Sequence, residues 1–171
     1  KVKPTLSLLA CVLVTTQAAP MYGQTDDCVT NGMVGTFVED QLLGSGRAED
    51  VAFGDFNNDG LLDVMVVCQG SAINEAWVNN GDGTFTEAQR FGEESVFTRS
   101  VALGDLDGDG YLDAITGTSG DNVVWIGNGD GTFIKGQEMS DGNSYGVALG
   151  DFNEDGHLDI LVGNYDSPSN P

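Results

Sequence analysis

The sequence is poor in basic residues. Lysine and arginine together number 6, against 27 aspartates and glutamates, so the 171 residues carry a formal net charge of −21. A surface this acidic repels nucleic acid and anionic membranes, and it attracts cations. We therefore expect no nucleic-acid partner and no insertion into a membrane, and we look for cation sites among the acids.

Histidine is nearly absent, which argues against most hydrolytic chemistry. The chain has one histidine, His157, so a Ser/His/Asp set would have to use that residue. No HExxH, P-loop or GxSxG motif is present. Paired aspartates can in principle hydrolyse glycosides, but their fixed spacing here is better explained by metal binding. We expect that this chain is not an enzyme.

Proline and helical patterns are missing from most of the chain. No proline occurs between Pro20 and Pro168, and no stretch after residue 24 has a convincing helical period. Short apolar or β-branched segments take their place, such as residues 51–53 and 63–67, with glycine-containing loops between them. The sequence therefore predicts an all-β fold.

The first 24 residues differ in composition from the rest. Lys1 and Lys3 precede an apolar run over residues 6–14, and small residues follow at Ala18 and Ala19. A charged start, an apolar middle too short for a bilayer span and a small-residue end are typical of a secretory signal peptide. We predict a signal peptide at 1–24, a mature region at 25–171 and a secreted or cell-surface location. The alternative is a buried strand or helix of the mature domain.

The three cysteines leave two questions open. Residues 8–11 resemble a bacterial lipoprotein box in which Cys11 would carry a lipid anchor, although the apolar run continues past Cys11 and argues against it. Cys28 and Cys68 could form a disulfide in an oxidising compartment. A buried free thiol is equally expected for Cys68, which lies in an apolar run.

The chain repeats itself with a period of about 48 residues. One element reads VAFGDFNNDGLLDVMVV from Val51, VALGDLDGDGYLDAITG from Val101 and VALGDFNEDGHLDILVG from Val147. A second element lies between these copies, as WVNNGDGTF from Trp77 and WIGNGDGTF from Trp125, and a degenerate NGMVGTF begins at Asn31. Asn-Gly and Asp-Gly are strong signals for a hairpin turn, so each unit predicts several short antiparallel strands.

Four short strands in 40 to 50 residues is the size of a β-propeller blade. The repeats predict blades of four-stranded antiparallel sheets, about three of them. Propellers usually need four to eight blades, so three do not close a ring. We expect an incomplete propeller of about seven blades, the N-terminal piece of a longer protein. The alternative is a ring completed by self-association.

The loops at 55–63, 105–113 and 151–159 have the composition of calcium sites. Side-chain oxygens stand at positions 1, 3, 5 and 9, glycine stands at position 6, and the carbonyl of position 7 adds a further oxygen. Ca²⁺ takes six to eight oxygen ligands, whereas Mg²⁺ prefers fewer protein ligands. The predicted ligands are Asp55, Asn57, Asp59, Leu61 and Asp63; Asp105, Asp107, Asp109, Tyr111 and Asp113; and Asp151, Asn153, Asp155, His157 and Asp159.

An EF-hand and a metal-free turn are the two alternatives to such a calcium loop. An EF-hand shares the first six positions but needs a glutamate at position 12, where this chain has Val66, Thr116 and Val162, and it needs flanking helices. A metal-free Asx-rich turn would leave three or four carboxylates crowded in nine residues without a cation. We therefore predict about three Ca²⁺ ions, one per loop, with loop 105–113 the tightest because it has four carboxylates.

The pattern VAxGDxxxDGxxD followed by W-x-x-NGDGTF resembles the FG-GAP/VCBS-type repeats of β-propellers, including those of integrin α-chains. The resemblance covers about residues 31–164, and Phe53-Gly54 matches the dipeptide that names the family. It implies that each loop binds Ca²⁺ and bridges strands of one blade, through the residues given above.

Two functions are compatible with this sequence. The first is an exported propeller with structural calcium that acts in adhesion or in recognition of a protein or glycan ligand. The alternative is an accessory propeller module of a secreted enzyme whose catalytic domain lies outside this sequence.

Overall fold

The computed structural model describes residues 12–14, 41–44, 47–69, 73–93, 96–140 and 143–165. These residues form strands and turns and contain no helix, as predicted. The strands are β1 (Val12–Val14), β2 (Gln41–Leu43), β3 (Arg47–Gly54), β4 (Asp63–Gln69), β5 (Asn74–Asn79), β6 (Phe85–Phe91), β7 (Thr98–Gly104), β8 (Asp113–Thr118), β9 (Asn122–Gly127), β10 (Phe133–Met139), β11 (Ser144–Gly150) and β12 (Asp159–Asn164).

Two complete blades form the centre of the molecule. The first blade has the strand order β3-β4-β5-β6 and the second β7-β8-β9-β10, each antiparallel throughout. β11 and β12 form a two-stranded third sheet with the register of the first two strands of a blade. β1 pairs with β2 in another two-stranded sheet. The predicted four-stranded antiparallel blades are therefore confirmed.

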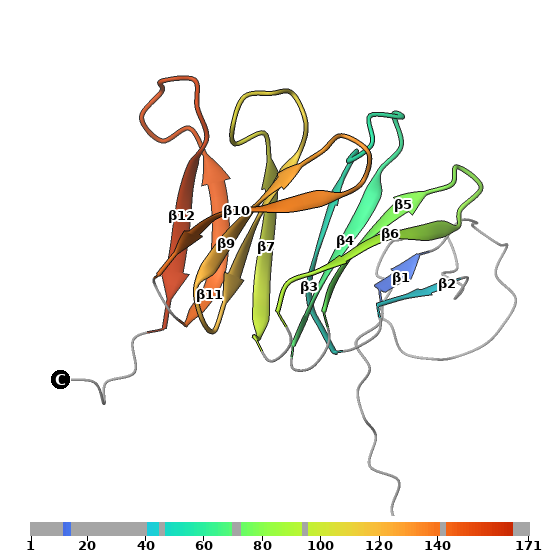
Figure 1. Ribbon diagram of the computed structural model, residues 1–171, viewed down its shortest axis with the longest axis horizontal. Coiled ribbons are helices and arrows are strands. Elements are labelled where there is room, and N and C mark those ends of the chain that lie inside the picture. Colours follow the sequence, from blue (N-terminus) through green and yellow to red (C-terminus); the bar gives the residue numbers. More distant parts are fainter. Residues whose placement is uncertain are drawn as a thin grey trace, which may run out of the picture.

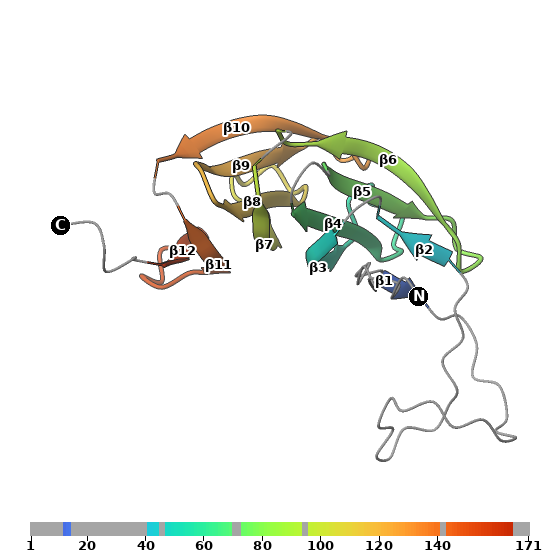
Figure 2. The same cartoon turned by 90° about the horizontal axis from the view of Figure 1, so that it is seen from below.

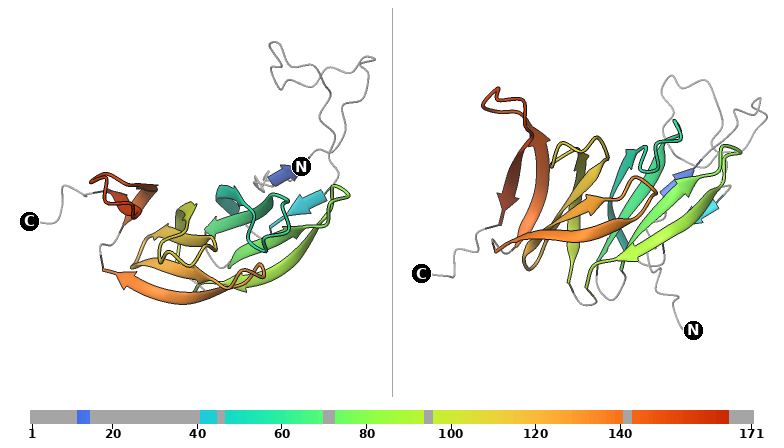
Figure 3. Two further views of the ribbon diagram at one scale, coloured as in Figure 1. Left: turned by 90° about the horizontal axis from the view of Figure 1, so that it is seen from above. Right: turned by 45° about the horizontal axis from the view of Figure 1, so that its top comes forward.

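The blades stand side by side along an arc (Figure 2). The first strands of the sheets, β3, β7 and β11, lie on the inner side of this arc, and the fourth strands, β6 and β10, lie on its outer side. Two further views show the same curvature (Figure 3). Radial packing of twisted sheets around a common axis is the architecture of a propeller, so this array is an incomplete one.

The main core lies between the first and second blades. Phe91 packs edge-on against Trp125 with ring centroids 4.9 Å apart, and Phe56 against Phe133 at 5.5 Å. Met65, which is fully buried, belongs to the same cluster. Edge-to-face aromatic pairs add to the stabilisation from apolar burial, so this joint fixes the two blades against each other.

A second apolar cluster joins β2 to the other face of the first blade. Leu43 is fully buried among Val64, Val66 and Phe85. The predicted signal peptide, apart from the backbone of β1, lies outside the described residues, as do Cys11 and Cys28. Cys68 is a buried free thiol, and burial raises its pKa to about 11.

Candidate metal centre

The three Asp-rich loops occupy equivalent places in the fold. Each connects the first strand of a sheet to the second, and all three lie along the same edge of the molecule (Figure 1). The flanking pairs Gly54 with Asp63, Gly104 with Asp113 and Gly150 with Asp159 are in register, so each loop leaves and re-enters its sheet at the same level. The repeat in sequence is thus a repeat in geometry.

A shared set of hydrogen bonds shapes the first half of each loop. The carboxylate at position 1 accepts a bond from the backbone N–H of the position 6 glycine, at 2.9 Å in Asp55, 3.0 Å in Asp105 and 2.8 Å in Asp151. The glycines adopt positive φ, between 85° and 92°. Glycine does so without steric cost, which explains why it recurs at this position.

Two further bonds turn the middle of each loop. The oxygen at position 3 accepts from the N–H of position 5, and the carboxylate at position 5 accepts from the N–H of position 7. In the second loop these bonds join Asp107 to Asp109 at 3.0 Å and Asp109 to Tyr111 at 2.8 Å. Such Asx-turns hold alternate side chains on the inside of the curl.

Asp113, at position 9, lies in a different environment from the other loop acids. It is fully buried, and its two carboxylate oxygens accept bonds of 2.8 Å from the N–H groups of Leu106 and Gly127. Asp63 repeats this with Phe56 and Asn79. Each of these aspartates therefore ties its loop to the third strand of its blade.

Asp159 is the position 9 residue of the third sheet, and it is only partly buried. It accepts a bond from the N–H of Phe152 at 3.0 Å. A third strand, which supplies the second donor in the complete blades, is not among the described residues here. The environment at position 9 therefore depends on completion of the blade.

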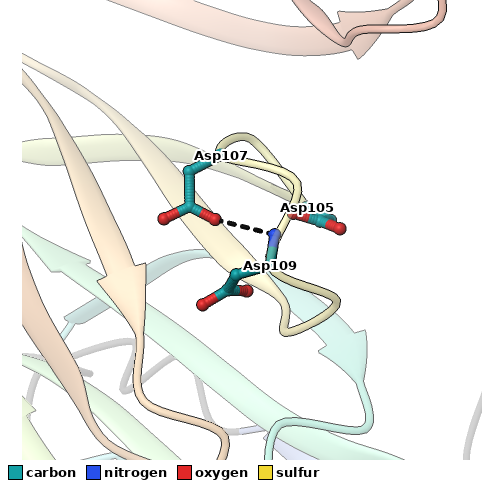
Figure 4. A group of neighbouring side chains, drawn as sticks. All are labelled: Asp105, Asp107 and Asp109. Carbon is teal, nitrogen blue, oxygen red and sulfur yellow. Dashed lines mark hydrogen bonds between the residues drawn. The ribbon is translucent and has the colours of Figure 1, made fainter.

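Three carboxylates converge in the second loop (Figure 4). Asp105, Asp107 and Asp109 each offer an oxygen within 4.8 Å of the others, and in the described part of the chain they are the acidic group with the spacing of a metal site. Asp105 is half-buried, and the other two are exposed. Hard carboxylate oxygens at this separation suit Ca²⁺, so the donor set fits that ion.

The other predicted ligands are placed as follows. The third-position residues of the first and third loops, Asn57 and Asn153, offer neutral oxygens with the same bonding pattern. Leu61, Tyr111 and His157 stand at position 7 and are exposed. Asp113 is not part of the convergent group, since its oxygens face backbone donors of the blade.

The loop acids also differ in pKa. Desolvation by burial raises the pKa of Asp63 above its ordinary 3.8, an effect that the N–H donors of Asn79 and Phe56 oppose. Backbone donors lower the pKa of Asp151 and Asp155, mainly from Gly156 and His157 respectively. Exposed positions 1 and 5 of the third loop thus favour the ionised form that a cation needs, whereas buried Asp63 resists ionisation.

A cavity of about 310 Å³ lies at the opposite end of the blades from the loops. Trp125, Thr98 and Thr118 line it, together with Lys135, which forms ion pairs with Glu93 at 3.0 Å and Glu138 at 2.6 Å. The sequence did not indicate this cavity, because it forms where the two blades meet and its residues come from separate repeats.

Comparison with protein-family models gives two overlapping matches. The model described as FG-GAP-like repeat matches residues 55–116 and 105–162, so each match runs from one loop into the next repeat. No curated protein matches the chain. The two matches together span more than half of the sequence and coincide with the blades and loops described above. The chain belongs to the family of FG-GAP-like repeat proteins.

Proposed function

We propose that this chain is an exported, calcium-binding propeller module in which Ca²⁺ stiffens the blades. The convergence of Asp105, Asp107 and Asp109 within 4.8 Å carries the proposal. Three like charges at this distance repel one another, and backbone bonds hold them in place. A divalent cation among them would convert this repulsion into attraction.

The same bonding pattern supports sites in the first and third loops. Asp55 and Asp59 of the first loop and Asp151 and Asp155 of the third present carboxylates at positions 1 and 5, with an asparagine between them. One carboxylate fewer lowers the charge of the donor set, and ligand charge tunes calcium affinity. We expect one ion per loop, with the second loop binding most tightly.

Calorimetric titration with Ca²⁺ after removal of metal by a chelator tests this function. We expect saturable binding at millimolar calcium or below and a rise in melting temperature on binding. The matched variant is Asp105→Asn with Asp109→Asn, which keeps the size of both side chains and removes two charges. It should lose the tightest site and leave the other two. Absence of both heat and a melting shift would refute calcium binding.

Recognition of a protein or glycan ligand is the biological role that we propose for the module. The cavity between the blades favours it, because its lining combines Trp125 with hydroxyl, ammonium and carboxylate side chains. Concave sites in which polar groups surround an aromatic side chain can fix the orientation of a polar ligand. A glycan array probed with and without chelator tests this role, with Lys135→Met as the variant that should weaken binding at the cavity.

Export is the cellular context that we propose, from the charged and apolar pattern of residues 1–24. Under this proposal the segment that includes β1 is removed. The described residues contain no helix with the length and hydrophobicity of a membrane span. Mass spectrometry of the secreted protein would locate the new N-terminus. A protein that stays in the cell with residues 1–24 attached would refute export.

A further inference from the structure

The two complete blades contain the same reactive dipeptide in two different settings. Asn80-Gly81 begins the turn between β5 and β6, and Asn128-Gly129 begins the turn between β9 and β10. Both asparagines are exposed. Asparagine is a thermally labile residue. It is most labile before glycine, because glycine has no side chain to hinder attack by its own backbone nitrogen.

One part of the turn is built in the same way in both hairpins. The backbone N–H of Asn80 donates to the carbonyl of Thr84, and that of Asn128 donates to the carbonyl of Thr132, both at 2.9 Å. The side-chain Nδ2 of each asparagine also donates to the hydroxyl of the same threonine, at 2.8 Å and 2.9 Å respectively. These bonds therefore do not distinguish the two asparagines.

Two further hydrogen bonds restrain the first hairpin. The N–H of Gly81, which is the group that would attack, donates to Oδ1 of Asn79 at 2.9 Å. The hydroxyl of Thr86 donates to Oδ1 of Asn80, the amide that would be attacked, at 3.0 Å. A reaction at Asn80 must give up both bonds before the two groups can meet.

The second hairpin lacks both of these bonds. Gly127 has no side chain to accept from the N–H of Gly129, and Ile134 has no hydroxyl to donate to Asn128. Within the described residues, neither that N–H nor Oδ1 of Asn128 has a hydrogen-bond partner. The attacking nitrogen and the amide carbonyl are therefore less restrained here than in the first hairpin.

Packing explains why no asparagine stands at position 127. A Cβ atom on Gly127 would lie 2.2 Å from the carbonyl oxygen of Leu112, so a side chain does not fit there. The ring of Tyr111 lies against Gly129, since a Cβ atom on Gly129 would be 2.3 Å from Cε1 of that ring. Individual contacts of this kind are weak, and they leave the N–H of Gly129 without an acceptor. The missing hydrogen bonds therefore decide the comparison.

We propose that Asn128 is a site of spontaneous deamidation and that its hairpin protects Asn80. The backbone nitrogen of Gly129 loses its proton to base and attacks Cγ of Asn128. The bond between Cγ and Nδ2 then breaks, ammonia leaves, and a cyclic succinimide forms. Water opens this ring at either carbonyl and gives aspartate or isoaspartate. The reaction needs no oxidant and no cofactor, and the chain gains one negative charge.

The modified turn lies at the joint between the two blades. The N–H of Gly131 donates to the carbonyl of Phe56 in the first blade at 3.2 Å, and a Cβ atom on Gly131 would be 2.7 Å from Cγ1 of Val78. Isoaspartate inserts a methylene group into the main chain of this same turn. The turn must then shift, so the modification weakens the contact between the blades.

Peptide mapping by mass spectrometry tests the site on the folded chain after incubation at mildly alkaline pH. Exchange of an amide for an acid raises the mass, which isomerisation of an aspartate does not. Because the first hairpin has two more hydrogen bonds to break, we expect Asn128 to react about tenfold faster than Asn80. Equal rates, or a faster Asn80, would overturn the proposal. Asn31-Gly32, which lies outside the described residues, is followed in its own peptide.

The denatured chain is the control for local sequence. Each of the two asparagines is followed by Gly-Asp-Gly-Thr, so in concentrated urea they should react at similar rates. A difference that persisted in urea would place its cause in the sequence and overturn the proposal. Calcium takes no part in the reaction, so this outcome is separate from that of the calcium titration. Circular dichroism verifies that the untreated chain stays folded throughout.

Two exposed substitutions exchange the protection between the hairpins. Ile134→Thr places a hydroxyl where Thr86 has one and should slow the reaction at Asn128 severalfold. Ile134 is 57% exposed, so the fold tolerates this change. Thr86→Val removes the hydroxyl and should speed the reaction at Asn80 by a similar factor. Rates that respond to neither substitution would overturn the assigned role of these hydrogen bonds.

Asn128→Gln is the reference for the effect on the joint, because the longer side chain closes a ring far more slowly. The aged natural chain should melt about 2–4 °C below its fresh form, the loss expected from about one weakened hydrogen bond. The aged Asn128→Gln chain should keep the melting temperature of its fresh form more closely. Equal falls in the two chains would overturn the effect on the joint.

Discussion

The two ends of the second loop use the same residue type for different purposes. Asp105, Asp107 and Asp109 lie on the open side of the loop, where their oxygens converge and two of the three side chains are exposed. Asp113 ends the same loop fully buried, with each oxygen bonded to a backbone N–H. The regularly spaced acids of this loop thus have two roles. Three form a cluster that attracts cations, and Asp113 forms hydrogen bonds that hold the loop to its blade.

Among the variants that test this division of roles, Asp113→Ala should have the largest effect on stability. The variant leaves the buried N–H of Gly127 and the partly buried N–H of Leu106 without acceptors, and each donor left unsatisfied costs about 1–3 kcal/mol. Urea unfolding in the presence of chelator should show a loss of about 2–6 kcal/mol. Asp109→Ala, under the same conditions, should change stability far less because its side chain is exposed. Equal losses in the two variants would contradict the division of roles.

An exchange of charge between loops sharpens the comparison at the open side. Asn57→Asp gives the first loop the carboxylate pattern of the second, and Asp107→Asn does the reverse. We expect each change to shift the calcium affinity of its own loop by about tenfold in opposite directions, which is about 1.4 kcal/mol.

The double variant is the control for this exchange. It keeps the total charge of the protein and should invert the order of the two sites in a calorimetric titration. Loss of one site without strengthening of the other would show that loop shape, rather than carboxylate number, sets the affinity.

Asp63, at the buried end of the first loop, should also titrate differently from Asp151 and Asp155, at the open side of the third loop. Because burial raises the pKa of Asp63 above 3.8, the folded state holds this proton more tightly than the unfolded state does. Its contribution to stability is greatest below pH 3.8 and is lost as pH rises through the raised pKa. Carbon-detected NMR in chelator should place the Asp63 midpoint above 3.8 and those of Asp151 and Asp155 below it. A common midpoint for all three would remove the distinction.

Much of this architecture could be predicted from sequence because its signals are local. The four-stranded blades follow from the repeated spacing of apolar segments, of Asp-Gly loops and of NGDGTF hairpins, and each of these lies within a few residues. The separation of Asp113 from the other loop acids could not be predicted in this way. Its second donor, Gly127, is 14 residues further along the chain, on a strand whose position depends on the whole blade.

The same limit applies to contacts between repeats. Nothing in the local pattern indicates that the Gln41 side chain forms hydrogen bonds with the backbone of Phe85, 44 residues away. Nor does it indicate that the Leu112 side chain packs against Gly54. These contacts become predictable only once the repeats are stacked in space. Residues at equal positions then have equal neighbours, except at the two ends of the described array, where Phe53 and Phe152 are exposed.

The smallest effect on stability that we expect concerns Asp82 and Asp130, the acids of the β5–β6 and β9–β10 hairpins. The hydroxyl and N–H of Thr132 both bond Asp130 and lower its pKa, and Thr84 does the same to Asp82. Thr132→Val removes the hydroxyl and keeps the N–H, so the pKa of Asp130 should rise toward 3.8.

A depressed pKa supplies stability that is present above pH 3.8 and is lost as pH falls through the folded value. The variant should therefore lose a little stability at neutral pH and none in strong acid, with Asp82 in the same sample as the internal control. An unchanged Asp130 midpoint would show that the backbone bond alone sets its pKa, which would make the hairpin acid a residue of the turn and no partner of the threonine.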